Sequence, residues 1–226
     1  MLTRVRHSRE TYDFEKQGHV RLLGVYSHSS LSYAGTTAQE AMMHLINEIT
    51  CCKEAVQHHL QHFPGKRLVI SVGATPQVLS SQHLLRKDHQ DHRKNPEAGT
   101  LRLLLKAPFS SDLDAKITVE LHAGAYLLLD MQQLSTDAGP HARSPHEDIV
   151  ISVLAEVCSV YNDGERSSPE AFLAAGTLAL GREPCPSYPG WAVVSPWRRS
   201  SPTSDSSSRL IVERISQEHS ITSVLG

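Results

Sequence analysis

A strand, a long helix and a second strand follow one another early in this chain. Residues 22–26 are apolar and form a run of strand length, and residues 67–72 form another. The second run has the continuous apolar character of a strand that is covered on both faces. Two such strands joined by a helix predict a parallel pair with a right-handed crossover. The chain is therefore expected to have an α/β architecture.

The helix between these strands has a clear start, period and end. Thr37-Ala38-Gln39-Glu40 has the spacing of a capping box. Apolar residues then recur every three or four positions from 42 to 60, whereas Glu48 and Glu54 are assigned to the polar face. Pro64-Gly65 ends the helix.

The composition favours a globular cytoplasmic protein. Charged residues make up 20% and apolar residues 39% of the 226 residues, and the formal net charge is −2. Basic residues are scattered among acidic ones, so the chain lacks the basic patch expected of a nucleic-acid-binding protein. No apolar run approaches the roughly 20 residues of a membrane helix, and no secretory signal is recognised at the N-terminus. The four cysteines have no CxxC spacing and are expected to be reduced, with Cys158 as a buried thiol. We predict a small-molecule or protein partner, and neither nucleic acid nor membrane.

Outside this unit, the chain divides into regions of different composition. Residues 1–20 have little periodicity and are expected to be poorly structured, and residues 21–133 form a first domain. Residues 134–148 are rich in Pro, Ser and Gly and predict a linker, and residues 149–226 predict a mostly β domain. Residues 80–100 indicate a partly disordered insertion. Further strands are expected at 116–121, 126–130, 149–161, 177–180, 191–195 and 210–215, whereas 101–105 fits a strand or the start of a helix.

Small or polar residues follow three of the predicted strands. Residues 71–76 and 120–126 both end a strand in residues with almost no side chain, so that backbone N–H groups can approach a phosphate. Residues 26–33 follow a third strand and carry hydroxyl groups and a histidine. Strands that present such residues at their carboxyl ends build the active sites of α/β barrels.

Several blocks of sequence, in this order, resemble the eukaryotic D-serine dehydratase family. The blocks lie at 26–33, 71–76, 120–133, 156–161, 174–183 and 214–219. The resemblance implies a pyridoxal phosphate protein of fold type III. Its first domain would be part of an alanine-racemase-like (β/α)8 barrel, the later strands alone, followed by an incomplete β-rich C-terminal domain. It also implies a fragment that is truncated at both ends.

The resemblance also implies an activity. The family eliminates the hydroxyl group of D-serine to give pyruvate and ammonia, which makes it a carbon–nitrogen lyase of D-amino acid metabolism. Pyridoxal 5'-phosphate supplies the electron sink, and zinc assists departure of the hydroxyl group. The expected partners are D-serine or another 3-hydroxy D-amino acid, and a second subunit in a homodimer or in a pair with a full-length relative.

Eight residues are implied to bind the cofactor. They are Tyr33, Gly73, Ala74, Thr75, His122, Gly124, Ala125 and Tyr126. The loop at 73–75 and the N–H groups at 124–125 would hold the phosphate, and His122 would face the pyridine nitrogen. Each residue type has a structural alternative: the Gly73 loop as an ordinary turn, His122 as a packed core histidine, and the two tyrosines as packing residues.

Two parts of the family chemistry have no counterpart in this sequence. The Schiff-base lysine lies in a segment resembling His-Val-Lys-Thr-His-Lys, and the zinc ligands form a His-x-Cys pair; neither pattern occurs here. We therefore assign no catalytic residue and no metal ligand. Two hypotheses stay open: a lyase whose missing segments belong to the complete product, or a non-catalytic remnant that binds pyridoxal phosphate weakly or serves as a dimerisation partner.

Overall fold

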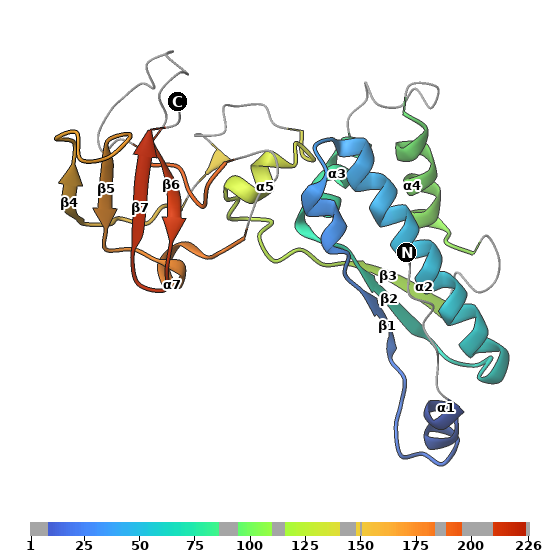
Figure 1. The fold of residues 1–226 in the computed structure, drawn as a ribbon. Coiled ribbons are helices and arrows are strands. Elements are labelled where there is room, and N and C mark those ends of the chain that lie inside the picture. The colour runs from blue at the N-terminus through green and yellow to red at the C-terminus, as the bar shows by residue number, and fades with distance from the viewer. Residues whose placement is uncertain are drawn as a thin grey trace. The chain divides into compact units, whose positions relative to one another are not determined.

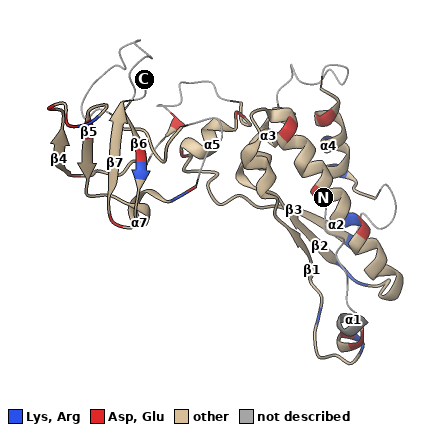
Figure 2. Ribbon diagram, viewed as in Figure 1, with Lys and Arg blue, Asp and Glu red and all other residues tan. Residues whose placement is uncertain are grey.

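The computed structural model describes residues 9–85, 95–109, 116–140, 148–149, 151–183, 189–195 and 210–224 (Figure 1). The chain divides into two compact units. The first unit comprises Met1–Tyr126 and Asp137–Pro140, and the second comprises Leu127–Thr136 and His141–Gly226. No helix in the described ranges is long and apolar enough to cross a membrane. Figure 2 shows acidic and basic residues interspersed along both units.

The first unit contains a parallel sheet. Strands β1 (Gly24–Ser27), β2 (Leu68–Val72) and β3 (Ile117–Leu121) lie in the order β1-β2-β3. Both pairings are parallel. The predicted strand–helix–strand unit is confirmed, because helix α2 (Ala38–His62) connects β1 to β2.

Helix α2 forms the core with one face of this sheet. The Thr37 hydroxyl accepts the Glu40 N–H at 3.2 Å, as the capping box predicts. Met42, Leu45 and Ile49 are fully buried and cluster with Ile70 and Val72 of β2. These aliphatic contacts provide the main apolar burial of the unit.

Four further helices of this unit are shorter than α2. They are η1 (Ser30–Ala34), α3 (Thr75–Ser81), η2 (Gln82–Leu85) and α4 (Pro96–Lys106). Residues 101–105, which fitted a strand or a helix, are helical, and Leu101 of α4 is fully buried in the α2 core. The predicted insertion at 80–100 therefore includes the end of α3, η2 and the start of α4, and its residues 86–94 lie outside the described part.

Helix α1 (Arg9–Lys16) lies in the segment for which the sequence indicates little periodic structure. The Glu15 carboxylate is buried, accepts the Leu22 N–H at 2.8 Å, lies 3.1 Å from His59 Nε2 and pairs with the Lys66 ammonium group. Tyr12 stacks on His59 with ring centroids 5.5 Å apart. These partners are distant in sequence, so a local period does not predict the helix.

The second unit contains an antiparallel β-sheet. Strands β4 (Val157–Tyr161), β5 (Glu170–Leu173), β7 (Ser220–Val224) and β6 (Leu210–Ile215) form an antiparallel sheet in this order. The unit also contains helices α5 (Met131–Ser135) and α7 (Thr177–Leu180).

Several predicted strands of this half are wrong in type or extent. Residues 177–180 form helix α7, because the Thr177 and Leu178 N–H groups donate to the Ser216 and Gln217 carbonyls instead of to a strand. Among the described residues of 149–161, only Val157–Tyr161 form a strand. The ranges 126–130 and 191–195 contain single bridges, from Leu129 to Ile149 and from Val193 to Ile211.

Candidate functional site

The segments that follow β1, β2 and β3 meet at one edge of the sheet, since parallel strands place their carboxyl ends together. The Ala125 N–H donates a hydrogen bond to Thr75 Oγ1 at 3.1 Å. The two loops that the sequence assigned to phosphate binding are therefore in contact. Thr75 is buried, and its hydrogen bond to Ala125 is partly buried.

Gly73 has a backbone conformation that suits glycine. Its φ is 124°, and a Cβ atom there would lie 3.0 Å from the His122 carbonyl oxygen. The Gly73 N–H donates to Glu48 Oε2 at 3.0 Å, and the Gly73 carbonyl accepts from His28 Nδ1 at 2.8 Å. Because both backbone groups of Gly73 are used, Gly73 shapes the loop and does not itself present an N–H group to a ligand.

The first turn of α3 provides N–H groups that no described residue satisfies. Ala74, Thr75 and Gln77 are buried, and the N-cap residue Ala74 makes no side-chain capping bond. Within the described residues, neither the N–H groups of Thr75 and Gln77 nor the Gln77 side-chain amide has a hydrogen-bond partner. Next to this turn, the position of a Cβ at Gly124 has no atom within 4 Å. Buried unpaired donors beside open space fit an anion with several acceptor oxygens.

His122 lies in a row of aromatic rings. Its ring is stacked on Tyr26 with centroids 4.7 Å apart and an interplanar angle of 12°. The His28 ring lies on it at 5.6 Å and 24°. His122 Nδ1 is 3.2 Å from Ser71 Oγ, and its Nε2 is buried with no hydrogen-bond partner among the described residues.

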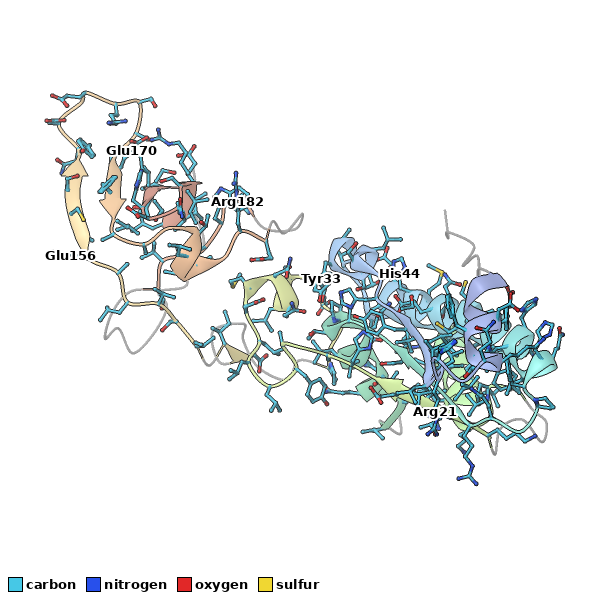
Figure 3. The ribbon with its side chains drawn as sticks, turned by 90° about the horizontal axis from the view of Figure 1, so that it is seen from below. Arg21, Tyr33, His44, Glu156, Glu170 and Arg182 are labelled. Atoms are coloured by element: carbon cyan, nitrogen blue, oxygen red, sulfur yellow. The ribbon has the colours of Figure 1, made fainter. Side chains whose placement is uncertain are left out.

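The two predicted tyrosines lie at the margins of this group. The Tyr126 hydroxyl accepts a hydrogen bond from Gln82 Nε2 at 2.7 Å. Tyr33 belongs to η1, and its ring is 6.4 Å from that of His28. Figure 3 shows Tyr33 beside the first turns of α2, near His44.

The structure adds residues that sequence reasoning did not assign to the site. Glu48, which the helical period placed on the polar face, is buried under the Gly73 loop. Tyr26, Ser71 and Glu120 occupy one row of the sheet. Period-two alternation along β2 places Ser71 on the face opposite Ile70, and this signal could have identified it. The burial of Glu48 has no such signal, because its partner is a backbone N–H far along the chain.

The lysines that the structure describes lie away from this edge. Lys66 and Lys116 precede β2 and β3 and so lie at the amino ends of the strands. Lys16 ends α1, Lys53 lies over the Phe109 ring, and Lys106 ends α4. Among the described residues there is also no group of three or more His, Cys, Asp or Glu side chains that could hold a metal ion.

The fold is that of the alanine-racemase-like proteins. An alanine-racemase-like protein from Idiomarina loihiensis covers 96% of this chain with 47% of its own, at a TM-score of 0.54 and 18% identity. A D-threo-3-hydroxyaspartate dehydratase variant covers 94% of this chain with 44% of its own, at a TM-score of 0.55 and 19% identity. These structural similarities support the mixed α/β fold class. The (β/α)8 barrel stays a prediction from the sequence.

The sequence comparisons narrow this class to a family. Residues 151–225 match the family described as "Putative serine dehydratase domain". D-serine dehydratases of Schizosaccharomyces pombe and Saccharomyces cerevisiae are 29% and 27% identical over 200 and 201 residues, or 88% of this chain. These matches support the assignment to the eukaryotic D-serine dehydratase family that the sequence blocks indicated. It spans 39% and 40% of the length of these two relatives.

Proposed function

We propose that this chain is part of a pyridoxal phosphate-dependent lyase that converts D-serine to pyruvate and ammonia. Its relatives from two yeasts are named D-serine dehydratases. A structural neighbour is named for the dehydration of another 3-hydroxy amino acid. Both names support elimination of a β-hydroxyl group as the reaction class.

The contact of Thr75 Oγ1 with the Ala125 N–H carries the cofactor proposal. It supports a phosphate site formed by the first turn of α3 and residues 124–125. Because Thr75 Oγ1 accepts from Ala125, its own proton is available for a phosphate oxygen. Two further features fit a phosphate group at this place. They are the unpaired N–H groups of Thr75 and Gln77 and the open space at Gly124.

The other residues of the group would bind and orient the cofactor. The Tyr126 hydroxyl accepts from Gln82, so its proton is directed to another acceptor, such as a phosphate or substrate oxygen. Tyr33, which lies in η1, is also proposed to donate a hydrogen bond to a phosphate or substrate oxygen. The imidazole of His122, which stacks with the rings of Tyr26 and His28, would face the pyridine nitrogen. When bound, the cofactor supplies the electron sink for removal of the substrate's α-proton.

A second candidate function follows from the positions of the lysines. Lys66 and Lys116 lie at the amino ends of the strands, Lys53 lies over the Phe109 ring, and no described lysine makes a hydrogen bond or ion pair with the residues of the site. A chain with the phosphate site and no amine beside it would bind pyridoxal phosphate reversibly without turnover, as a cofactor-binding remnant or a pairing partner. We assign no catalytic residue to the described part of the chain.

Titration of the purified chain with pyridoxal phosphate tests both candidates. Binding is measured by quenching of intrinsic fluorescence, and pyruvate is measured with D-serine and, as a stereochemical control, L-serine. Thr75→Val is expected to weaken binding about tenfold, because it removes one hydroxyl donor and unpairs the Ala125 N–H. Thr100→Val, on the exposed side of α4, is the matched control.

Each outcome of this experiment separates the candidates. Saturable binding with pyruvate from D-serine supports the lyase. Saturable binding that Thr75→Val weakens, without pyruvate, supports the non-catalytic candidate for this chain. If the chain does not bind pyridoxal phosphate, or if both threonine variants bind like the wild type, the proposed site is wrong.

A further inference from the structure

A short polar chain crosses the sheet face opposite α2. Tyr26, Ser71 and Glu120 lie opposite one another in β1, β2 and β3. Ser71 Oγ donates a hydrogen bond to Glu120 Oε1 at 3.2 Å, and the same oxygen is 3.2 Å from His122 Nδ1. The serine hydroxyl therefore stands between a carboxylate and an imidazole.

This order of groups determines where the protons lie. A carboxylate can only accept, so the single proton of the Ser71 hydroxyl points to Glu120. The contact between Ser71 Oγ and His122 Nδ1 is then a hydrogen bond only if Nδ1 carries a proton and donates it. A neutral His122 with its proton on Nδ1 has an unprotonated Nε2, which is an acceptor.

The arrangement differs from a nucleophilic triad. In a serine hydrolase the imidazole lies between the hydroxyl and the carboxylate and takes the hydroxyl proton. Here the hydroxyl lies in the middle, so neither neighbour turns Ser71 into a nucleophile by that route. The effect of Ser71 and Glu120 is on the imidazole.

The plane of the imidazole is also fixed. Tyr26 stacks on His122 at 4.7 Å and 12°, and His28 at 5.6 Å and 24°. The Nε2 atom is buried and has no donor among the described residues. A buried acceptor without a partner is a place where a ligand's N–H or O–H group gains a hydrogen bond.

We propose that Ser71 and Glu120 are positioning residues that hold His122 in the Nδ1–H tautomer, so that Nε2 offers the bound ligand an acceptor. The identity of this ligand rests on the proposed function: it is a pyridine ring whose nitrogen carries a proton. An acceptor beside the ring nitrogen favours its protonated form. The protonated ring withdraws electrons more strongly from the substrate, which links the tautomer of His122 to the strength of the electron sink.

The tautomer can be measured without any cofactor. In the chain labelled with ¹⁵N at histidine, proton–nitrogen correlation spectra distinguish Nδ1–H from Nε2–H, and His122→Gln assigns the signals. The wild type is expected to show Nδ1–H. Ser71→Ala removes the acceptor, and Glu120→Ala frees the serine proton for Nδ1, so both variants are expected to shift His122 to Nε2–H.

Thr118→Ala is the matched control for these variants. Thr118 lies on the same strand and face as Glu120 and pairs with Val69, two register positions away from the Ser71–Glu120 pair. It is expected to leave the tautomer unchanged. An Nε2–H tautomer in the wild type, or an Nδ1–H tautomer that survives both Ser71→Ala and Glu120→Ala, would overturn the proposal.

A separate experiment tests whether His122 Nε2 accepts a hydrogen bond from the ring nitrogen. Affinity is compared for pyridoxal phosphate and for its analogue with C–H in place of the ring nitrogen. The wild type and Thr118→Ala are expected to prefer pyridoxal phosphate about tenfold, the contribution of one hydrogen bond to a charged donor. Ser71→Ala is expected to lose most of this preference.

The results distinguish the inference from the function on which it rests. If neither compound binds, the proposed cofactor site is wrong, and the tautomer spectra still decide whether Ser71 and Glu120 position His122. If both compounds bind equally to the wild type, the cofactor site stands and the assigned role of His122 Nε2 is overturned.

Discussion

The carboxylate of Glu48 in α2 accepts a hydrogen bond from the backbone N–H of Gly73 at the end of β2, with Oε2 and N 3.0 Å apart. Glu48 is 2% exposed, so this bond lies in the core of the first unit. On the other side, the Gly73 carbonyl accepts from His28. Helix α2 and the segment after β1 thus hold the loop that leads into α3 from two directions.

Glu48→Ala is expected to lower the free energy of unfolding by about 2–3 kcal/mol, because it leaves a buried N–H group without an acceptor and a cavity beside it. Glu48→Gln keeps an acceptor oxygen and is expected to lose less. Urea unfolding followed by far-ultraviolet circular dichroism, which reports α2, measures both. Glu54→Ala, an exposed acidic residue of the same helix, is the control and should change stability by less than about 0.5 kcal/mol. Equal losses at Glu48 and Glu54 would contradict the assigned contact.

Gly73→Ala and Gly124→Ala are expected to separate folding from ligand binding. At Gly73 a Cβ meets the His122 carbonyl at 3.0 Å and φ is 124°, so alanine should cost about 1–3 kcal/mol in unfolding free energy. At Gly124 a Cβ has no atom within 4 Å, so the fold should be unaffected. The added methyl group fills the space proposed for the phosphate, and affinity for pyridoxal phosphate should fall severalfold. The reverse pattern, with Gly73→Ala neutral and Gly124→Ala unfolded, would show that the loop geometry is wrong.

The sequence predicts the parts of the fold whose causes are local. The Thr37 cap and the apolar period define α2, and the two apolar runs that flank it define β1 and β2. The meeting of the Thr75 and Ala125 loops also follows, because parallel strands end at a common edge.

The sequence does not predict the features that depend on contacts with residues distant in the chain. Helix α1 depends on the contact of Glu15 with His59, and α7 depends on carbonyls at Ser216 and Gln217. Glu48 belongs to the polar set by composition but is buried because one backbone N–H needs an acceptor. The sequence also does not predict the tautomer of His122, because the tautomer depends on the strand register that places Ser71 beside Glu120.

Thiol labelling in the folded chain is expected to discriminate between Cys52 and Cys158. Burial raises the pKa of the Cys52 thiol to about 11, so about one in a thousand of these thiols is ionised at pH 8. Cys158 is exposed on β4, although its apolar neighbours predict a buried thiol, because β4 is the edge strand of its sheet. Mass spectrometry of peptides after brief treatment with a maleimide should find label at Cys158 and almost none at Cys52. In urea both should react. Rapid labelling of Cys52 in the folded chain would show that the α2 core is open.

Gly176→Ala is expected to destabilise the second unit. A Cβ at this position would lie 2.4 Å from the Ser216 carbonyl oxygen, 2.5 Å from that of Gln217 and 2.5 Å from the His219 N. All three are backbone atoms of the turn between β6 and β7, so the turn or α7 must move, at a cost of about 1–3 kcal/mol. Tryptophan fluorescence during urea unfolding reports this unit, because both tryptophans of the chain lie beyond residue 190. Leu178→Ala truncates a side chain of the same helix that is 77% exposed and should be nearly neutral. A Gly176→Ala variant as stable as Leu178→Ala would mean that α7 does not dock on this turn.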